Sequence, residues 1–103
     1  MSYTLTADKE TTDILLNTIH HFTPDHQLLM LNSELDEVRE EILNIICAFN
    51  KKSDEPFLEE FYLECADVCT VMLQFFLDKG DYQKYFDTSL KNLIEKHYNH
   101  FKK

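Results

Sequence analysis

The sequence is poor in the residues that interrupt helices. It contains one glycine, two prolines and no tryptophan in 103 residues, whereas 44% of its residues are hydrophobic and eight are phenylalanine. So little glycine and proline leaves few places for tight turns, and this composition favours long helices over a sheet of many short strands. A chain of this length predicts one domain that buries enough surface to fold without disulfide bridges.

Positive charge is also scarce. Ten Lys and Arg residues stand against nineteen Asp and Glu residues, and a formal net charge of −9 argues against nucleic acid as a partner. No apolar run approaches the roughly 18 residues that span a bilayer, and the first residues do not resemble a secretory signal. The three cysteines, an odd number, are typical of free thiols in a reducing compartment. The sequence therefore predicts a cytoplasmic protein with no nucleic-acid or membrane partner.

Apolar spacing and capping residues predict four helices, over residues about 7–22, 24–50, 55–79 and 81–101. Thr23 and Pro24 are a typical N-cap and first residue of the second helix. Gly80 suits the position just beyond the third helix, and Asp81 is the expected N-cap of the fourth. The expected fold is one all-α domain over residues 1–103, a four-helix bundle-like arrangement with two long antiparallel helices at its centre.

The third predicted helix is apolar almost all round between Val71 and Leu77. A helix with no polar face must be covered on every side, and four helices of these lengths barely suffice. The sequence therefore predicts self-association through this segment, as a homodimer or homotetramer.

Two pairs of acidic residues stand three apart on the two central helices: Glu34 with Glu37, and Glu64 with Asp67. Residues at i and i+3 share a face of a helix, so each pair can hold one cation between its carboxylates. If the helices pack side by side, the four carboxylates converge. Hard oxygen ligands of this kind suit Mg²⁺ or Mn²⁺.

Acidic residues on helices more often form a solvated face, and the apolar pattern separates the two interpretations. Residues 28–49 carry an apolar stripe at alternating spacings of three and four, and Glu34 flanks it. In the third helix Glu64 falls on the stripe itself, where an unpaired carboxylate is costly. No Lys or Arg lies between Lys52 and Lys79 to pair with it locally, which favours a metal ion.

These acidic pairs resemble the motifs of the all-α nucleoside triphosphate pyrophosphohydrolases, the MazG-like group with its dUTPase and phosphoribosyl-ATP pyrophosphohydrolase relatives. That group carries EExxE on one helix and ExxD on the next. Here Glu34-Leu35-Asp36-Glu37 matches the last four positions of the first motif. Glu64-Cys65-Ala66-Asp67-Val68 resembles the second, often written ELADV. Ser33 stands where the first Glu of the family would be, and the resemblance covers about residues 23–80.

The resemblance implies Mg²⁺-dependent hydrolysis of a nucleoside triphosphate, ribose or deoxyribose, to the monophosphate and pyrophosphate. The implied metal ligands are Glu34, Glu37, Glu64 and Asp67. One of these carboxylates, or nearby Glu41, would orient the attacking water as general base. Lys84 and Lys91 would neutralise charge on the departing pyrophosphate, and Phe22 or Tyr62 would help to form the base pocket. The alternative is a non-catalytic, oligomeric helical regulatory module, in which the missing Glu marks a decayed metal site.

Overall fold

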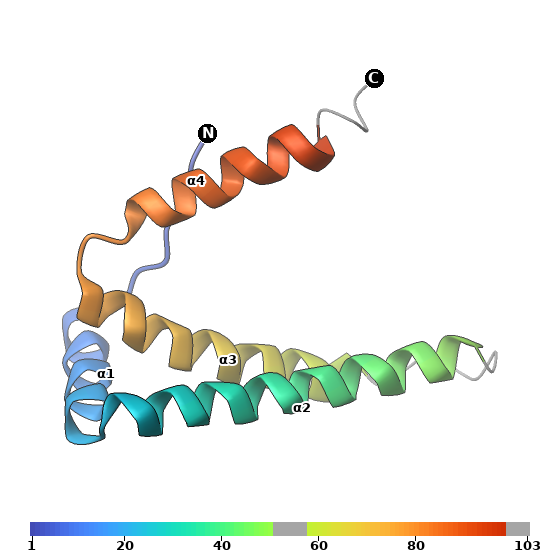
Figure 1. Ribbon diagram of the computed structural model, residues 1–103, viewed down its shortest axis with the longest axis horizontal. Helices are drawn as coiled ribbons and strands as arrows, with labels where there is room; N and C mark the ends of the chain where they lie inside the picture. Colours follow the sequence, from blue (N-terminus) through green and yellow to red (C-terminus); the bar gives the residue numbers. More distant parts are fainter. Residues whose placement is uncertain (51–57, 99–103) are drawn as a thin grey trace.

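The structure is a computed structural model that describes residues 1–50 and 58–98. Its elements are α1 (Lys9–His21), α2 (Pro24–Asn50), α3 (Leu58–Lys79) and α4 (Gln83–Leu93), the last continued by a π-helical turn, η1 (Ile94–Tyr98) (Figure 1). These two stretches of chain contain no strand, so the all-α prediction is confirmed. None of the described helices combines the length and the apolar character that crossing a bilayer requires.

The local signals in the sequence set several of the helix ends. The Thr23 hydroxyl accepts a hydrogen bond from the His26 amide at 3.2 Å, and Pro24 is the first residue of α2, as predicted. Gly80 adopts φ +91°, and its amide donates to the Phe76 carbonyl at 3.0 Å, which ends α3 with the left-handed residue expected there. The start of α2 and the end of α3 therefore follow from local chemistry.

The fourth helix begins two residues later than the sequence predicts. Tyr82, and not Asp81, occupies the N-cap position, without a side-chain capping bond. The Tyr82 ring instead packs 5.8 Å from Phe76 and 5.6 Å from Phe86, so aromatic packing fixes how the chain enters the helix. The Asp81 carboxylate lies 4.0 Å from the Lys84 ammonium. Residues 55–57 and 99–101 of the predicted helices lie outside the described residues.

The two long helices run antiparallel, side by side, and α1 packs on α3 across one end of the pair (Figure 1). Four of the five buried apolar side chains of the described chain gather at that end, two from α1 and two from α3: Leu15, Ile19, Val68 and Val71. The fifth, Phe86, lies on α4. A contact between the His20 ring and the Asp78 carboxylate, 2.5 Å long, joins the ends of α1 and α3. The core is therefore small and lies toward one end of the α2–α3 pair.

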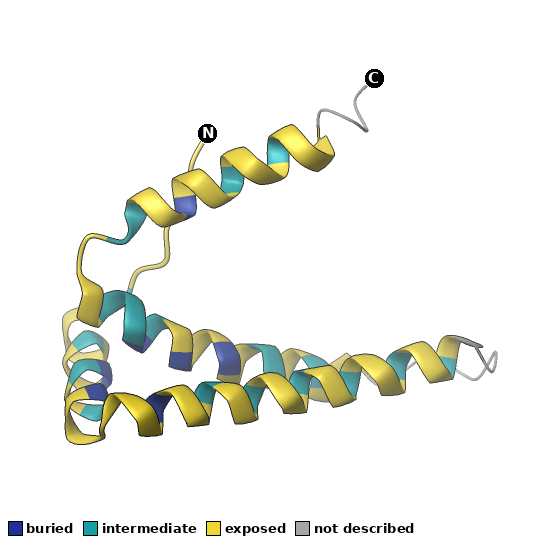
Figure 2. Cartoon of the chain, in the orientation of Figure 1, coloured by how far each residue is buried: buried dark blue, intermediate teal, exposed yellow. Residues whose placement is uncertain are grey.

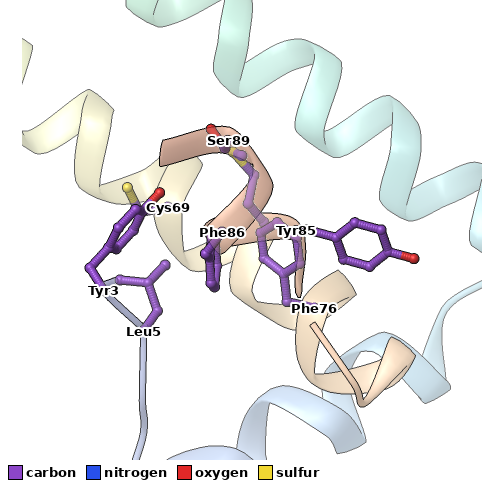
Figure 3. A pocket seen from close by; sticks show the side chains of 8 residues that line it. Tyr3, Leu5, Cys69, Phe76, Tyr85, Phe86 and Ser89 are labelled. Atoms are coloured by element: carbon purple, nitrogen blue, oxygen red, sulfur yellow. The ribbon is translucent and has the colours of Figure 1, made fainter. Parts of the chain in front are cut away.

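The fourth helix diverges from the α2–α3 pair and touches α3 only near the turn that joins them (Figure 1). The Phe76 and Phe86 rings lie 4.9 Å apart, and the N-terminal arm fits between the two helices. The Tyr82 hydroxyl donates to the Leu5 carbonyl at 2.9 Å, and Gln83 Nε2 donates to the Tyr3 carbonyl at 2.7 Å. A hollow of about 420 Å³ remains beside this aromatic cluster (Figure 3). The arm and the aromatic rings, rather than a closed bundle, hold α4.

Elements of the same chain cover most of the segment that the sequence marks for self-association. Val71 and Gln74 are buried, and four more residues of the segment are half-buried: Leu73, Phe75, Phe76 and Leu77. Met72 is the exception, with 38% of its surface exposed. The packing of α1, α2, the arm and the start of α4 around α3 leaves little of this segment for a partner.

Candidate metal centre

The antiparallel packing of α2 and α3 brings the four predicted ligands together. Glu34 and Glu37 lie one turn apart on α2, Glu64 and Asp67 one turn apart on α3, and the opposite chain directions set the two pairs face to face. One carboxylate oxygen from each of the four residues lies within 4.8 Å of the others. We refer to Glu34, Glu37, Glu64 and Asp67 as the acidic tetrad.

Half of the acidic tetrad is withdrawn from solvent. Glu34 and Glu64 are half-buried, and in each the Oε2 atom is buried without a hydrogen-bond partner, whereas Glu37 and Asp67 are exposed. No Lys, Arg or His in the described parts of the chain forms an ion pair with any of the four. Buried carboxylate oxygens without a counter-charge are costly, so a bound cation would stabilise this arrangement.

The environment of Glu64 stabilises its protonated form. A hydrogen bond with the Glu37 carboxyl, burial, and the negative charges of Glu37, Asp67 and Glu34 together raise the pKa of Glu64 from its ordinary 4.5 to about 7. Two ionised carboxylates have no proton to share, so the bond to Glu37 forms only when one of the pair is protonated. Without a cation, Glu64 therefore stays protonated to a higher pH than an ordinary glutamate does.

Glu34 is shifted in the same direction for a different principal reason. Burial raises the pKa of its carboxyl first, the charges of Glu37 and Asp67 raise it further, and a hydrogen bond with Glu37 adds to the effect. Both half-buried members of the acidic tetrad thus resist ionisation while no positive charge is present. A divalent cation would remove both causes by neutralising the charges and occupying the unpartnered oxygens.

Two glutamines extend the polar seam between the long helices, and sequence reasoning did not single them out. Gln27 lies seven residues before Glu34 on α2, and Gln74 lies seven residues after Asp67 on α3. Gln27 has no exposed surface and neither of its amide atoms has a partner, while Oε1 of buried Gln74 is also unpartnered. The signal that could have revealed them is this seven-residue spacing, which keeps a side chain on the same helical face.

Glu41, the predicted general base, lies on the same face of α2 as the acidic tetrad. It is half-buried, seven residues after Glu34 and four after Glu37. A helix rises 1.5 Å per residue, so Glu41 is about 6 Å along the axis from Glu37. Glu41 is not one of the converging ligands.

The two predicted phosphate-binding lysines lie on another part of the molecule. Lys84 and Lys91 are both on α4, which diverges from the helices that carry the acidic tetrad (Figure 1). Lys84 lies 4.0 Å from Asp81 and above the Tyr85 ring, and Lys91 lines a separate surface groove. The fold does not bring them beside the tetrad within one chain, because α4 departs at Gly80 instead of folding back along α3.

The two aromatic residues predicted for the base pocket have different surroundings. Phe22 stacks on His26 at 4.5 Å and lines an apolar hollow of about 390 Å³ with Ile19, Pro24 and Phe75. Tyr62 is 63% exposed, and it stands two residues before Glu64, which turns it about 200° away on the helix. Phe22 is therefore the one of the two that faces a hollow, next to Pro24 at the start of α2, which lies about 15 Å along the helix axis from Glu34.

No family model, curated protein or solved structure matches the chain. The acidic tetrad is therefore the feature of the chain that points to a function. Its four carboxylates are the hard oxygen donors that Mg²⁺ and Mn²⁺ prefer, and its two unpartnered oxygens fit a bound divalent ion.

Proposed function

We propose that the protein is a Mg²⁺-dependent nucleoside triphosphate pyrophosphohydrolase of the MazG-like kind, which converts a ribo- or deoxyribonucleoside triphosphate to the monophosphate and pyrophosphate. One observation carries the proposal: four carboxylates from two antiparallel helices converge within 4.8 Å, and two of them bury an oxygen that has no partner. The resemblance of both acidic motifs, in the same order along the chain, supports this function over other uses of a divalent ion.

The buried and exposed residues of the acidic tetrad would contact the ion from different sides. Half-buried Glu34 and Glu64 would hold the ion from the helix seam, and exposed Glu37 and Asp67 would hold it at the surface, where a triphosphate can approach. Bound Mg²⁺ supplies Lewis-acid chemistry, since it neutralises phosphate charge and lowers the pKa of a coordinated water. Without such an ion, the net charge of −9 would repel a triphosphate.

A general base would complete the site. Glu41 suits this role because it lies one turn beyond Glu37 on the same helix and is not among the converging ligands, so its carboxylate remains available to accept a proton from water. The second candidate is one of the four carboxylates of the acidic tetrad itself, which would lie beside a water molecule on the bound ion.

The proposal is tested by incubating the protein with a panel of ribo- and deoxyribonucleoside triphosphates and Mg²⁺ and measuring pyrophosphate release. Glu64→Gln should abolish release while the circular dichroism spectrum stays helical. Asp36→Asn is the matched control on the outer face of α2, where Asp36 makes only an exposed 3.8 Å pair with Arg39. It should change turnover little, because exposed ion pairs contribute at most about 1 kcal/mol. Equal losses in both variants would contradict the assignment of the tetrad.

The alternative is a non-catalytic, oligomeric helical module whose metal site has decayed. It predicts no pyrophosphate release from any nucleotide, with or without Mg²⁺ or Mn²⁺. Ser33, which is exposed on α2 beside Glu34, is the residue at which this alternative departs from the family pattern.

A further inference from the structure

The hollow beside Phe22 lies at the end of the molecule where α1, α2 and α3 meet. Its volume of about 390 Å³ is within the range of small-molecule pockets, roughly 300–1,000 Å³. Figure 2 shows that the buried positions of these three helices lie toward the same end. The walls come from all three helices and from the turn between α1 and α2: Ile19, His20, Phe22, Pro24, Phe75 and Asp78. The hollow is therefore framed by the best-packed part of the fold.

The walls of this hollow combine aromatic and aliphatic surface with two polar side chains. Phe22 and Phe75 contribute rings, and the polar side chains are those of His20 and Asp78. Aromatic side chains hold flat heterocycles by stacking, and a small number of polar groups then fixes the orientation of the ring. The composition of the hollow therefore suits a planar heterocycle with polar atoms on its edge.

Asp78 has one carboxylate oxygen available to a molecule in the hollow. Its Oδ1 atom lies 2.5 Å from Nε2 of His20, and within the described parts of the chain its side chain makes no other polar contact. The side chain is 48% exposed, so Oδ2 can accept a hydrogen bond from a ligand. An ionised carboxylate accepts and never donates, so the ligand must supply the N–H or O–H group.

A second acceptor lies one turn before Asp78 on α3. Gln74 is buried, with 8% of its surface exposed, and its Oε1 atom has no hydrogen-bond partner. Residues four apart share a helical face, so both acceptors lie on the same side of α3. A buried acceptor without a donor is costly, and each such group in a native protein needs an explanation. This end of the molecule therefore lacks donors, and an amino group carries two.

The hollow and the acidic tetrad lie along the same edge of α3. Asp67 of the tetrad and Asp78 are eleven residues apart, which is close to three full turns. Their side chains therefore point within about 20° of each other, at positions separated by roughly 16 Å along the helix axis. An extended nucleoside triphosphate is long enough to bridge this distance. A nucleotide whose phosphates are held at the tetrad can thus place its base in the hollow.

We propose that Asp78 determines which nucleobase the protein accepts, favouring a base with an exocyclic amino group, cytosine or adenine, that is stacked on Phe22 in the hollow. This inference rests on the proposed function and deepens it. Cytosine N4 and adenine N6 are amino donors, whereas guanine and thymine carry a carbonyl oxygen at the corresponding position, as uracil does. An amino group would donate to Asp78 Oδ2, and a carbonyl oxygen would be repelled by the same carboxylate.

Pairs of substrates that differ in this one group test the inference by pyrophosphate release. Wild type should show a kcat/KM at least about tenfold higher for CTP than for UTP, and for ATP than for ITP, because a hydrogen bond to a charged group is lost. Asp78→Asn should bring both ratios toward one, since an amide can present either a donor or an acceptor. Asp13→Asn is the control, because it removes an exposed 3.3 Å ion pair with Lys9 outside the hollow, and it should keep the wild-type ratios. If the pair with His20 is merely structural, Asp78→Asn will lower both rates by one factor and leave the ratios unchanged, which overturns the inference.

Binding of free nucleosides separates this inference from the proposed hydrolysis. Cytidine against uridine, and adenosine against inosine, are compared by saturation-transfer NMR in chelator, where neither phosphate nor metal takes part. Tighter binding of cytidine and adenosine, lost in Asp78→Asn, supports the role of Asp78 even if no triphosphate is hydrolysed, a result that would overturn the proposed function alone. Hydrolysis of all triphosphates at similar rates, with equal binding of the paired nucleosides, overturns the role of Asp78 alone. Neither hydrolysis nor nucleoside binding overturns both.

Discussion

The variant Glu64→Gln tests the acidic tetrad through the pH dependence of stability. The pKa of Glu64 is raised from 4.5 to about 7 in the folded protein. Between these two values the folded state holds a proton that the unfolded state has lost. The free energy of unfolding of the metal-free protein should therefore fall as the pH rises from about 4.5 to 7 and level off above 7. Glu34, whose pKa is also raised, contributes with the same sign.

Replacing the carboxyl by an amide removes this titration. In chelator, Glu64→Gln should lose less stability between pH 5 and 7 than wild type does. Above pH 7 it should melt at least as high as wild type, because a neutral amide relieves the repulsion among the four carboxylates. The remaining slope would include the contribution of Glu34.

Metal addition should reverse the order of the two melting temperatures, so that wild type melts higher than Glu64→Gln. An ion that binds only the folded form stabilises it by about 2.7 kcal/mol at a hundredfold excess over Kd. For a domain of this size that gain corresponds to roughly 10–20 °C in melting temperature. Wild type should show such a rise in millimolar Mg²⁺ or Mn²⁺ at pH 8, whereas Glu64→Gln, which lacks one anionic ligand, should respond weakly.

The assay is thermal unfolding followed by circular dichroism between pH 5 and 8, in chelator and in metal, at one protein concentration. Asp36→Asn serves as the matched control, since it also converts an acid of this region to an amide but on the exposed outer face. It should keep both the pH dependence and the metal response of wild type. Identical metal responses in wild type and Glu64→Gln would refute the reasoning, because acids that are merely solvated give a small salt effect shared by both.

Two further variants test the helix seam and the turn after α3. Gln27→Leu should raise the melting temperature, because it removes a fully buried amide whose two polar atoms have no partner. Burying such a group unpaired costs about 1–3 kcal/mol. A lower melting temperature would show instead that Gln27 makes a hydrogen bond essential to the fold. Gly80→Ala should lower the melting temperature by several degrees, since φ is +91° at this position and a residue with a Cβ atom adopts that conformation at a cost of roughly 1 kcal/mol. Steric contact adds nothing, because open space surrounds the position. An unchanged midpoint in thermal unfolding would contradict this.

Local chemistry in the sequence was sufficient for the helices and for much of the candidate site. Thr23, Pro24 and Gly80 act within one turn of their own position, so the ends they define could be predicted from neighbours along the chain. The spacing of Glu34 with Glu37 and of Glu64 with Asp67 places each pair on one helical face whatever the tertiary structure. Antiparallel packing of the two long helices was then enough to predict their convergence.

Tertiary structure alone decided how the N-terminal arm and α4 are placed and which surfaces of the described chain remain exposed. The Tyr82 ring packs against Phe76 and Phe86, contacts that depend on the path of the turn, so the start of α4 and its divergence could not be inferred from Asp81 as a cap. For the same reason Lys84 and Lys91 are placed away from the tetrad. The apolar pattern of α2 predicts which sides of the helix are hydrophobic. Only the arrangement of the described helices shows that Leu28, Leu35, Ile42 and Phe49 remain exposed, because periodicity fixes a helical face and not its neighbour.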